Sequence, residues 1–152
     1  MTENKTLIKE AIKEFKEEEK EKQKDRRLHN TRLLMRNYNS LKEHIDKVNG
    51  DLDIEVDNVD DEVWITSITR TKLRTMKMMA YIDSALDIIE KRFKSNCEEY
   101  KYKAFTLYYI DKKSNEEIQE LLDCGKNSPK IWSDLVTSEL SLLLWGIEAL
   151  GM

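Results

Sequence analysis

Apolar residues recur at helical spacing along most of the chain. Between Trp64 and Phe93 they repeat with a period close to 3.6 residues, at Leu73, Met76, Met79, Ile82, Leu86 and Ile89. Such a period places the apolar side chains on one face of an α-helix. The same spacing recurs over residues 5–48, 98–111 and 129–150. With only four glycines and one proline to end helices, the sequence predicts an all-α fold, a helical bundle.

A charged segment near the N-terminus interrupts this pattern. Residues 16–27, KEEEKEKQKDRR, contain no apolar residue and follow a short apolar stripe that ends at Phe15. A helix with nothing to bury stays solvated or frays. We therefore predict a long, partly solvated N-terminal helix whose residues 1–28 form a charged arm that frays or pairs with another chain. The helical domain is predicted to span residues 29–150.

An acidic segment, residues 51–62, follows Asn49-Gly50 and contains no lysine or arginine. Its alternating apolar residues would suit a strand, but a single strand has no partner in this chain. We therefore predict a loop or linker here. Two interpretations of its role stay open: a plain solvated linker, or a regulatory segment that lies over a basic surface and hinders DNA contact.

Two short helices joined by a tight turn are predicted between residues 114 and 135. Ser114 and Glu117 have the spacing of a capping box, which begins a helix. Gly125 is expected to take a left-handed conformation in the turn. Ser128 is then expected to cap the second helix, with Pro129 at its first position. This outline is that of a helix-turn-helix within a module at about residues 98–150, although an ordinary helical hairpin has it too.

Residues near the second helix of this pair are suited to DNA recognition. Asparagine can read adenine, and lysine can reach guanine or a phosphate. The candidate DNA contacts in this segment are Lys126, Asn127, Ser128, Lys130 and Ser133. Basic clusters at residues 20–36 and 70–77 supply candidate phosphate contacts at Arg26, Arg27, Arg70 and Arg74. A solvated helical face is the alternative interpretation of the cluster at residues 20–36.

The net charge of the chain does not by itself favour DNA binding. The net charge of the chain is −4, and residues 98–152 contain six lysines against ten Asp or Glu residues. Two lysines at the start of the second helix are a small electrostatic contribution for a DNA-binding module. We therefore expect phosphate contacts to come from another part of the chain or from a partner.

The sequence offers little support for catalysis, metal binding or membrane insertion. Cys97 and Cys124 have neither CxxC spacing nor a neighbouring histidine, so we expect free thiols in a reducing cytoplasm, with no metal and no cofactor. The chain contains no Gly-rich phosphate loop, HExxH motif or nucleophile elbow, and we do not expect an enzyme. No apolar stretch of the sequence, Leu142 to Trp145 included, is long enough to span a membrane.

The order of these features resembles that of the small phage and prophage late-gene regulators of the ArpU and RinA type. The shared features are a Tyr-x-x-Leu helix, an acidic loop, a long helix from Thr69 onward, and a Tyr-x-x-Phe element before the Ser-Asn-Glu-Glu-Ile-x-x-Leu-Leu unit. In those regulators the C-terminal part resembles region 4 of sigma-70 factors. The resemblance covers about residues 30–150. Tyr38 and Leu41 carry its first feature, and Tyr102 and Phe105 carry its fourth.

Membership of this family would imply a DNA-binding transcription regulator that binds double-stranded DNA near promoters and acts with RNA polymerase. By position, the first helix of the motif matches Ser114, Glu117, Ile118 and Leu122. Gly125 matches the turn, and the start of the recognition helix matches Ser128, Lys130, Ile131 and Leu135. The target sequence and the choice between activation and repression are left open by this resemblance.

A second function class remains open. The C-terminal half of the last predicted helix is apolar nearly all round, as is typical of buried or oligomeric helices. This pattern suits a helical adaptor or assembly protein, such as a small terminase subunit-like oligomer, that forms a homo-oligomer through the C-terminal helix.

Overall fold

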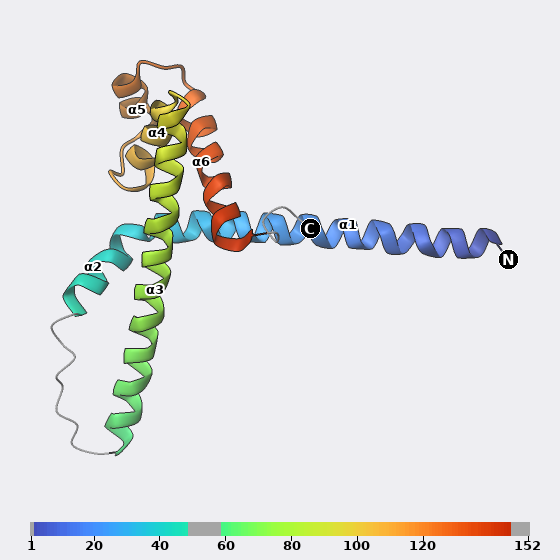
Figure 1. The fold of residues 1–152 in the computed structure, drawn as a ribbon, viewed down its shortest axis with the longest axis horizontal. Helices are drawn as coiled ribbons and strands as arrows, with labels where there is room; N and C mark the ends of the chain where they lie inside the picture. The colour runs from blue at the N-terminus through green and yellow to red at the C-terminus, as the bar shows by residue number, and fades with distance from the viewer. Residues whose placement is uncertain (1, 49–58, 147–152) are drawn as a thin grey trace.

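The computed structural model describes the backbone of residues 2–48 and 59–146, and the side chains of residues 3–46 and 70–146. The described backbone contains no strand. Its helices are α1 (Thr2–Arg36), α2 (Tyr38–Val48), α3 (Val59–Ser95), α4 (Glu99–Tyr109), α5 (Asn115–Leu122) and α6 (Ser128–Trp145). Figure 1 shows how they are arranged. The prediction of an all-α fold is confirmed.

The N-terminal helix is continuous from the arm into the folded body. All side chains from Glu3 to Arg26 are exposed, and this part of α1 projects from the body as a single helix (Figure 1). Burial begins near Thr31, which is fully enclosed, and Met35 then joins the core. A long, partly solvated N-terminal helix is therefore confirmed. At Asn37 the helix ends, and α2 starts in a new direction.

The helix predicted to begin at Trp64 is longer than the periodicity indicated. Because α3 starts at Val59, residues 59–62 of the predicted acidic linker are helical, which corrects that part of the prediction. Residues 51–58 of the linker lie outside the described residues. At its other end α3 stops at Ser95, and the Glu98 N–H donates to the Phe93 carbonyl at 2.8 Å across Cys97, which is left-handed.

Most of the buried apolar side chains form one core between α1, α2, α3, α4 and α6. Phe105 and Ile89 are fully enclosed there, and burying one such side chain stabilises the fold by roughly 1.5–3 kcal/mol. The members of this core are Met35, Tyr38, Met79, Ile82, Ala85, Leu86, Ile89, Phe93, Phe105, Tyr109, Val136 and Leu140. Met79 is thus a core residue, as its place in the helical period suggests.

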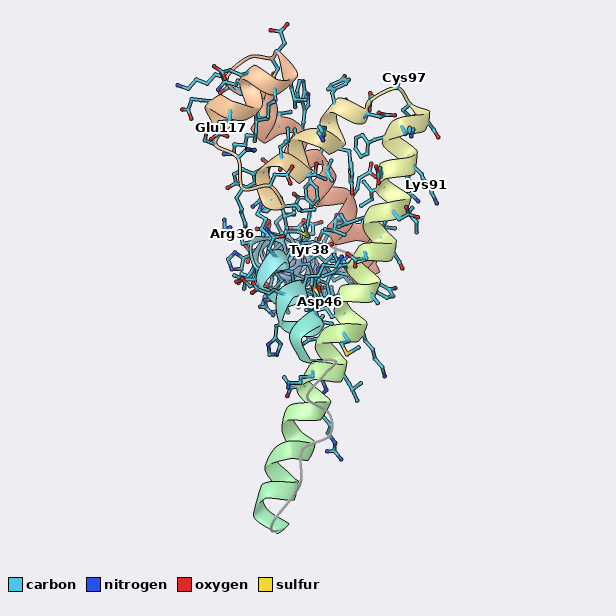
Figure 2. All side chains as sticks on the ribbon, turned by 90° about the vertical axis from the view of Figure 1, so that its left-hand side faces the viewer. Arg36, Tyr38, Asp46, Lys91, Cys97 and Glu117 are labelled. Carbon is cyan, nitrogen blue, oxygen red and sulfur yellow. The ribbon has the colours of Figure 1, made fainter. Side chains whose placement is uncertain are left out.

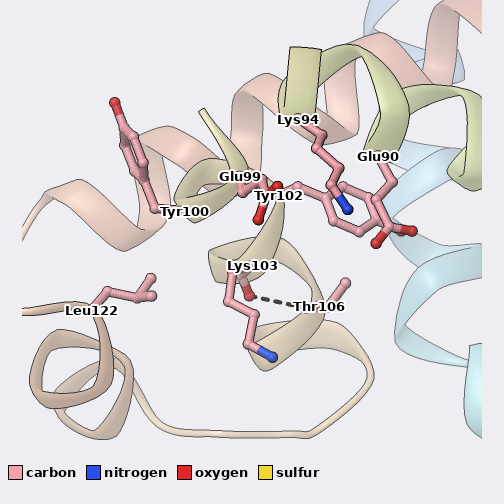
Figure 3. A pocket seen from close by; sticks show the side chains of 8 residues that line it. All are labelled: Glu90, Lys94, Glu99, Tyr100, Tyr102, Lys103, Thr106 and Leu122. Atoms are coloured by element: carbon pink, nitrogen blue, oxygen red, sulfur yellow. Dashed lines mark hydrogen bonds between the residues drawn. The ribbon is translucent and has the colours of Figure 1, made fainter. Parts of the chain in front are cut away.

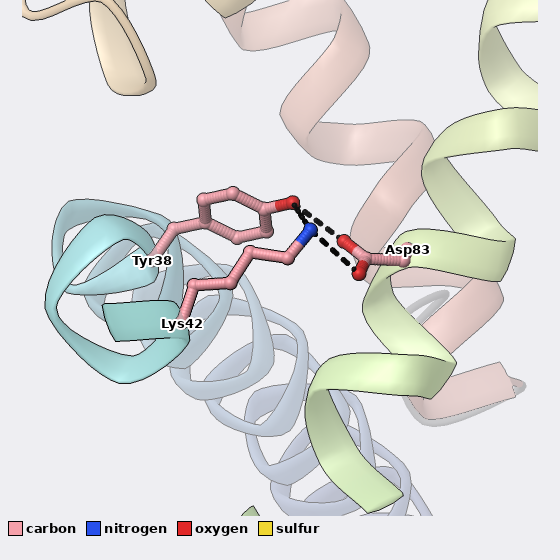
Figure 4. A network of polar contacts seen from close by, with 3 residues as sticks. All are labelled: Tyr38, Lys42 and Asp83. Carbon is pink, nitrogen blue, oxygen red and sulfur yellow. Dashed lines mark hydrogen bonds and ion pairs between the residues drawn. The ribbon is translucent and has the colours of Figure 1, made fainter. Parts of the chain in front are cut away.

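A polar network fixes α2 against α3 at the edge of this core (Figure 4). The Tyr38 hydroxyl donates to Asp83 Oδ1 at 2.5 Å, and Lys42 Nζ lies 2.9 Å from Asp83 Oδ2. Lys42 Nζ also donates to the Tyr38 oxygen at 3.0 Å. Burial and the Asp83 carboxylate raise the pKa of Tyr38, and the hydrogen bonds to Tyr38 and Asp83 raise the pKa of Lys42. Both donors therefore keep their protons over the ordinary pH range.

A second, smaller core holds α5 onto α4 and α6. It contains Ala104 and Leu107 of α4 together with Ile118 of α5, and it is covered by Leu122 and Trp132. Because α6 also packs against α1 and α3, this three-helix unit is continuous with the rest of the body. The turn between α5 and α6 is therefore held on a rigid support.

The start of α5 agrees with the predicted capping box. The Glu117 N–H donates to Ser114 Oγ at 3.3 Å, and the Ser114 hydroxyl donates to the Glu117 carboxylate at 3.2 Å. The left-handed residue that ends α5 is Asp123, with φ 49°, and not Gly125 as predicted. Aspartate is one of the few residues that adopt this conformation at low cost. Gly125 has no positive φ, and a Cβ there would meet only Ser128 Oγ at 3.8 Å.

The start of α6 differs from the prediction by one residue. Ser128 is the first helical residue rather than the cap, and Asn127 occupies the cap position without a side-chain hydrogen bond. Pro129 is buried in the first turn, where a missing N–H costs nothing. The Asn127 side chain therefore makes no capping hydrogen bond to the first turn of α6.

Candidate nucleic-acid interface

A groove of about 900 Å³ lies where the end of α1 meets the turn between α5 and α6. Its walls come from α1, α4, α5 and the start of α6, and we call it the basic groove. The lining residues are Arg32, Arg36, Tyr108, Tyr109, Asn115, Ile118, Lys126, Asn127, Pro129, Lys130, Ile131, Ser133 and Asp134. In Figure 2, Arg36 of α1 and Glu117 of α5 lie at one edge of the molecule. Lys91 of α3 and Cys97 lie at the opposite edge.

Hydrogen bonds between distant segments fix the walls of the basic groove. Lys112 Nζ donates to the Arg36 carbonyl at 2.9 Å, and Asn39 Nδ2 donates to the Ile110 carbonyl at 2.7 Å. Both bonds attach the α4–α5 connection to the α1–α2 junction. Across the turn, Asn115 Nδ2 donates to the Lys126 carbonyl at 3.2 Å. The turn is therefore held in place from both sides.

Positive charge predominates in the basic groove. Four cations line it, Arg32 and Arg36 from α1 and Lys126 and Lys130 from the turn and α6. They face one lining carboxylate, Asp134, which lies 3.7 Å from the Arg32 guanidinium. The N-terminal end of α6 also opens here, and a helix N-terminus carries partial positive charge. In a chain of net charge −4, this surface is suited to an anionic ligand.

Comparison of the chain with protein-family models, with curated proteins and with solved structures found no match.

Most of the residues predicted to bind DNA near the turn are accessible. Lys126, Asn127 and Lys130 are exposed, and Ser128 is partly exposed. Ser133 is only 6% exposed, since its side of α6 packs on the body, and its carbonyl accepts from Thr137 Oγ1 at 2.8 Å. Ser133 lines the basic groove with only a small exposed surface, and its contact with DNA stays a prediction.

The two arginines predicted as contacts on the arm have different environments. Arg26 is exposed on α1 and does not line the basic groove. The Arg27 guanidinium lies over the Trp145 ring, 4.9 Å from its centroid. Trp145 Nε1 donates to Thr31 Oγ1 at 3.0 Å, and the Thr31 hydroxyl donates to the Arg27 carbonyl at 2.8 Å. Arg27 thus joins α1 to the end of α6 and does not line the basic groove, and its role as a phosphate contact stays a prediction.

The basic cluster of α3 is not brought to the basic groove. Arg70 and Arg74 are exposed in the N-terminal half of α3 and do not line the basic groove. At a rise of about 1.5 Å per residue, roughly 30 Å of helix separates Arg74 from the α4 end of α3. The candidate phosphate contacts of α3 and those of the turn therefore do not form one surface.

The sequence reasoning missed Arg32 and Arg36 as individual site residues. Both were part of the basic window at residues 20–36, and their i, i+4 spacing places them on one face of a helix. That spacing was the available signal. Which part of residues 20–36 lies beside the α5–α6 turn depends on where α1 packs against the body. The local sequence pattern does not predict this packing.

A second cavity, of about 590 Å³, lies between α3, α4 and Leu122 of α5 (Figure 3). Its charged groups alternate in sign, with Glu90 and Glu99 beside Lys94 and Lys103. Burial and the Glu90 carboxylate raise the pKa of Tyr102, another lining residue, to about 12. A pocket without an excess of either charge has no electrostatic preference for nucleic acid, so the basic groove is the better candidate.

Three further properties bear on other function classes. Among the described residues, no group of three or more His, Cys, Asp or Glu side chains is placed to hold a metal ion. Cys97 and Cys124 are free thiols. No described helix has an apolar stretch long enough to cross a membrane.

Proposed function

We propose that this protein is a DNA-binding transcription regulator that binds duplex DNA through the basic groove and the exposed start of α6. The observation that carries the proposal is the convergence of Arg32 and Arg36 with Lys126 and Lys130 around one groove. The exposed Asn127 lies among these cations. In this proposal Arg32 and Arg36 supply phosphate contacts in addition to those of Lys126 in the turn and Lys130 on α6.

The residues that line the basic groove are suited to two kinds of DNA contact. Arginines on a helix beside the turn are suited to the phosphates, which position a protein on DNA but carry no sequence information. Lys130 and Asn127 occupy the exposed start of α6, and a major groove about 12 Å wide admits such a helix. In this proposal α6 reads bases, and the end of α1 contacts the backbone of the duplex.

The biological setting of the proposal comes from the resemblance to phage and prophage late-gene regulators. It assigns the protein to promoter-proximal DNA in the cytoplasm, acting with RNA polymerase on phage or prophage genes. The helix, turn and helix over residues 114–145 agree in order with that resemblance. The exposure of Lys130 at the start of α6 agrees with a recognition helix.

Binding of labelled random duplexes, followed by selection of the bound sequences, tests the proposal. Arg32→Ala with Arg36→Ala is expected to weaken binding to every duplex and to lower the salt slope by about 2. Lys130→Ala or Asn127→Ala is expected to weaken selected sequences more than random ones. The matched control is Arg70→Ala with Arg74→Ala, an exposed i, i+4 pair outside the groove. Absence of duplex binding at low salt would rule the function out.

One observation favours the second candidate function, a helical adaptor or assembly protein. Ile131 and Leu135 are 56% and 46% exposed on α6, so the C-terminal helix offers an apolar surface that a homo-oligomer or another partner can cover. Light scattering separates the two candidates. A large closed ring favours assembly, whereas a monomer or dimer that binds duplex DNA favours the regulator.

A further inference from the structure

An exposed tyrosine lies in the wall of the basic groove. Tyr108 of α4 lines the groove together with the four cations, and 48% of its side chain is exposed. Its neighbour Tyr109 lines the groove too, but only 4% of that side chain is exposed. Contacts to phosphate need the cations alone. Tyr108 adds a flat apolar surface to a groove that is otherwise suited to phosphates.

The Tyr108 ring is held in place and keeps an open face. It packs edge-to-face with Tyr109, with 4.7 Å between the ring centroids and an interplanar angle of 81°. Tyr109 packs in turn on Phe105 of the core, at 5.1 Å between centroids. An edge-to-face contact uses at most one face of either ring, so at least one face of Tyr108 is not used by it. No arginine or lysine in the described part of the chain lies over this ring.

The groups near Tyr108 match the remaining parts of a nucleotide. Burial raises the pKa of Tyr109, and the Arg32 and Arg36 guanidinium groups act in the opposite direction, so both arginines lie close to the tyrosine pair. Asn127 is exposed and makes no capping hydrogen bond, and its amide can donate to and accept from the edge of a base. The groove thus offers cations for a phosphate, a ring for the face of a base and an amide for its edge.

A paired base cannot use the Tyr108 ring. In a duplex each base is stacked between its neighbours and presents only its edges in the grooves. The face of a base becomes accessible when the base leaves the stack. Proteins that bind single strands combine a basic groove, which follows the backbone, with aromatic side chains on which bases stack. The combination of Tyr108 with the four cations therefore favours unpaired DNA.

We propose that the basic groove binds an unpaired stretch of DNA adjoining the bound duplex, with one base stacked on Tyr108. This inference rests on the proposed DNA-binding function and adds the class of DNA that the groove selects. Arg32 and Arg36 hold the backbone of the unpaired strand, and the open face of Tyr108 receives the base.

Fluorescence anisotropy with the full chain at low salt tests this preference. The probes are a fully paired duplex, the same duplex with a short run of mismatches, and the mismatched duplex with abasic sites in place of the mismatched bases. The abasic probe keeps the flexibility of the mismatched probe but offers no base to stack. We expect the mismatched duplex to bind about tenfold more tightly than the paired duplex, and the abasic sites to abolish this gain.

Substitution of the ring tests its part in the preference. Tyr108→Ala is expected to reduce the preference for the mismatched duplex from about tenfold to less than about twofold. Tyr108→Phe should keep it, because phenylalanine retains the ring. The matched control is Tyr81→Ala on α3, whose parent side chain is 61% exposed and lies outside the groove, and it should keep the preference as well. An equal loss of affinity for paired and mismatched probes in Tyr108→Ala overturns the proposal.

Photo-crosslinking of the wild-type chain locates the stacked base without any substitution. Iodouracil at a mismatched position crosslinks to an aromatic side chain that stacks on it, and mass spectrometry identifies the residue. We expect the crosslink at Tyr108. A crosslink only at Tyr81 or Tyr100, or none at all, overturns the proposal.

The anisotropy probes also separate this inference from the function on which it rests. Equal affinity for paired and mismatched duplexes overturns the inference and leaves duplex binding intact. Equal affinity for mismatched and abasic duplexes overturns it too, because the gain then comes from flexibility of the DNA. Failure of every probe to bind overturns the inference and the DNA-binding function together.

Discussion

The Arg32 guanidinium lies 3.7 Å from the Asp134 carboxylate, so an ion pair joins the last turns of α1 to α6 across the basic groove. The two side chains are 36% and 42% exposed. An ion pair this exposed contributes at most about 1 kcal/mol to stability. Its larger effect is electrostatic, because Asp134 offsets one of the cations that line the groove.

Replacing Asp134 by asparagine is therefore expected to strengthen duplex binding. Removal of one negative charge and release of Arg32 should raise the affinity about three- to tenfold at low salt, with a change in unfolding free energy below about 1 kcal/mol. Fluorescence anisotropy with a labelled duplex measures the effect. Glu139→Gln is the matched control, since Glu139 is also 42% exposed and pairs with Arg92 at 3.8 Å outside the groove. Equal effects of the two changes would contradict a role for Asp134 in the groove.

Arg27→Ala is expected to affect stability rather than DNA binding. The change removes the contact with the Trp145 ring, and cation–π contacts contribute roughly 0.5–2 kcal/mol. We expect the unfolding free energy to fall by about 1 kcal/mol and duplex affinity to remain within twofold of wild type. Urea unfolding followed by tryptophan fluorescence, together with anisotropy, separates the two effects. Arg26→Ala, at the exposed neighbouring position, should leave stability unchanged.

Tyr38→Phe is expected to loosen the attachment of α2 to α3. It removes the hydroxyl that donates to Asp83 and accepts from Lys42. Loss of a hydrogen bond at a partly buried site costs about 1 kcal/mol. Hydrogen exchange should show faster exchange in α2 than in α4, which lies outside the network. Tyr108→Phe is a suitable control, because Tyr108 is exposed and lies on α4. Uniform acceleration in all helices would contradict a local effect.

Stability is expected to fall at alkaline pH. Burial raises the pKa of Tyr38, and burial with the Glu90 carboxylate raises the pKa of Tyr102 from 10.0 to about 12. The folded chain therefore holds these protons more tightly than the unfolded chain does. Stabilisation is complete below about pH 10 and is lost as the pH rises to about 12. Urea unfolding across this range should show the loss, and Tyr102→Phe should reduce it. Stability that rises above pH 10 would contradict the assignment.

The turn between α5 and α6 provides a test of its own geometry. Gly125→Ala is expected to change the unfolding free energy by less than about 0.5 kcal/mol, because φ is not positive and the added Cβ meets only ordinary contacts. Asp123→Gly is expected to be neutral or stabilising by up to about 1 kcal/mol, because glycine adopts the left-handed conformation without strain. Thermal unfolding of the two variants measures both effects. A large loss of stability in Gly125→Ala would contradict this expectation and support the left-handed conformation first predicted for Gly125.

Predictions from the sequence pattern were correct where the structure depends on interactions between neighbouring residues. The helical period around Met79, the capping box at Ser114 and the solvated run before Arg27 each depend on residues within a few positions. For the same reason the errors at the turn are small. Asp123, not Gly125, is left-handed, and α6 begins at Ser128 instead of after it. Asp123 and Gly125 can both take a left-handed conformation, and Asn127 and Ser128 are both suited to the cap position, so the local pattern does not choose between them.

The sequence by itself determined the helices and the charged, solvated arm, because each follows from the period of a single helix. Only the tertiary structure decided which charges share a surface. It placed Arg32 and Arg36 around one groove with Lys126 and Lys130, turned Arg27 onto Trp145, buried Ser133, and left Arg70 and Arg74 outside the groove on the N-terminal half of α3. The physical reason is that the docking of α1 and α6 is set by apolar contacts between residues far apart in the chain, and the charged side chains follow that packing.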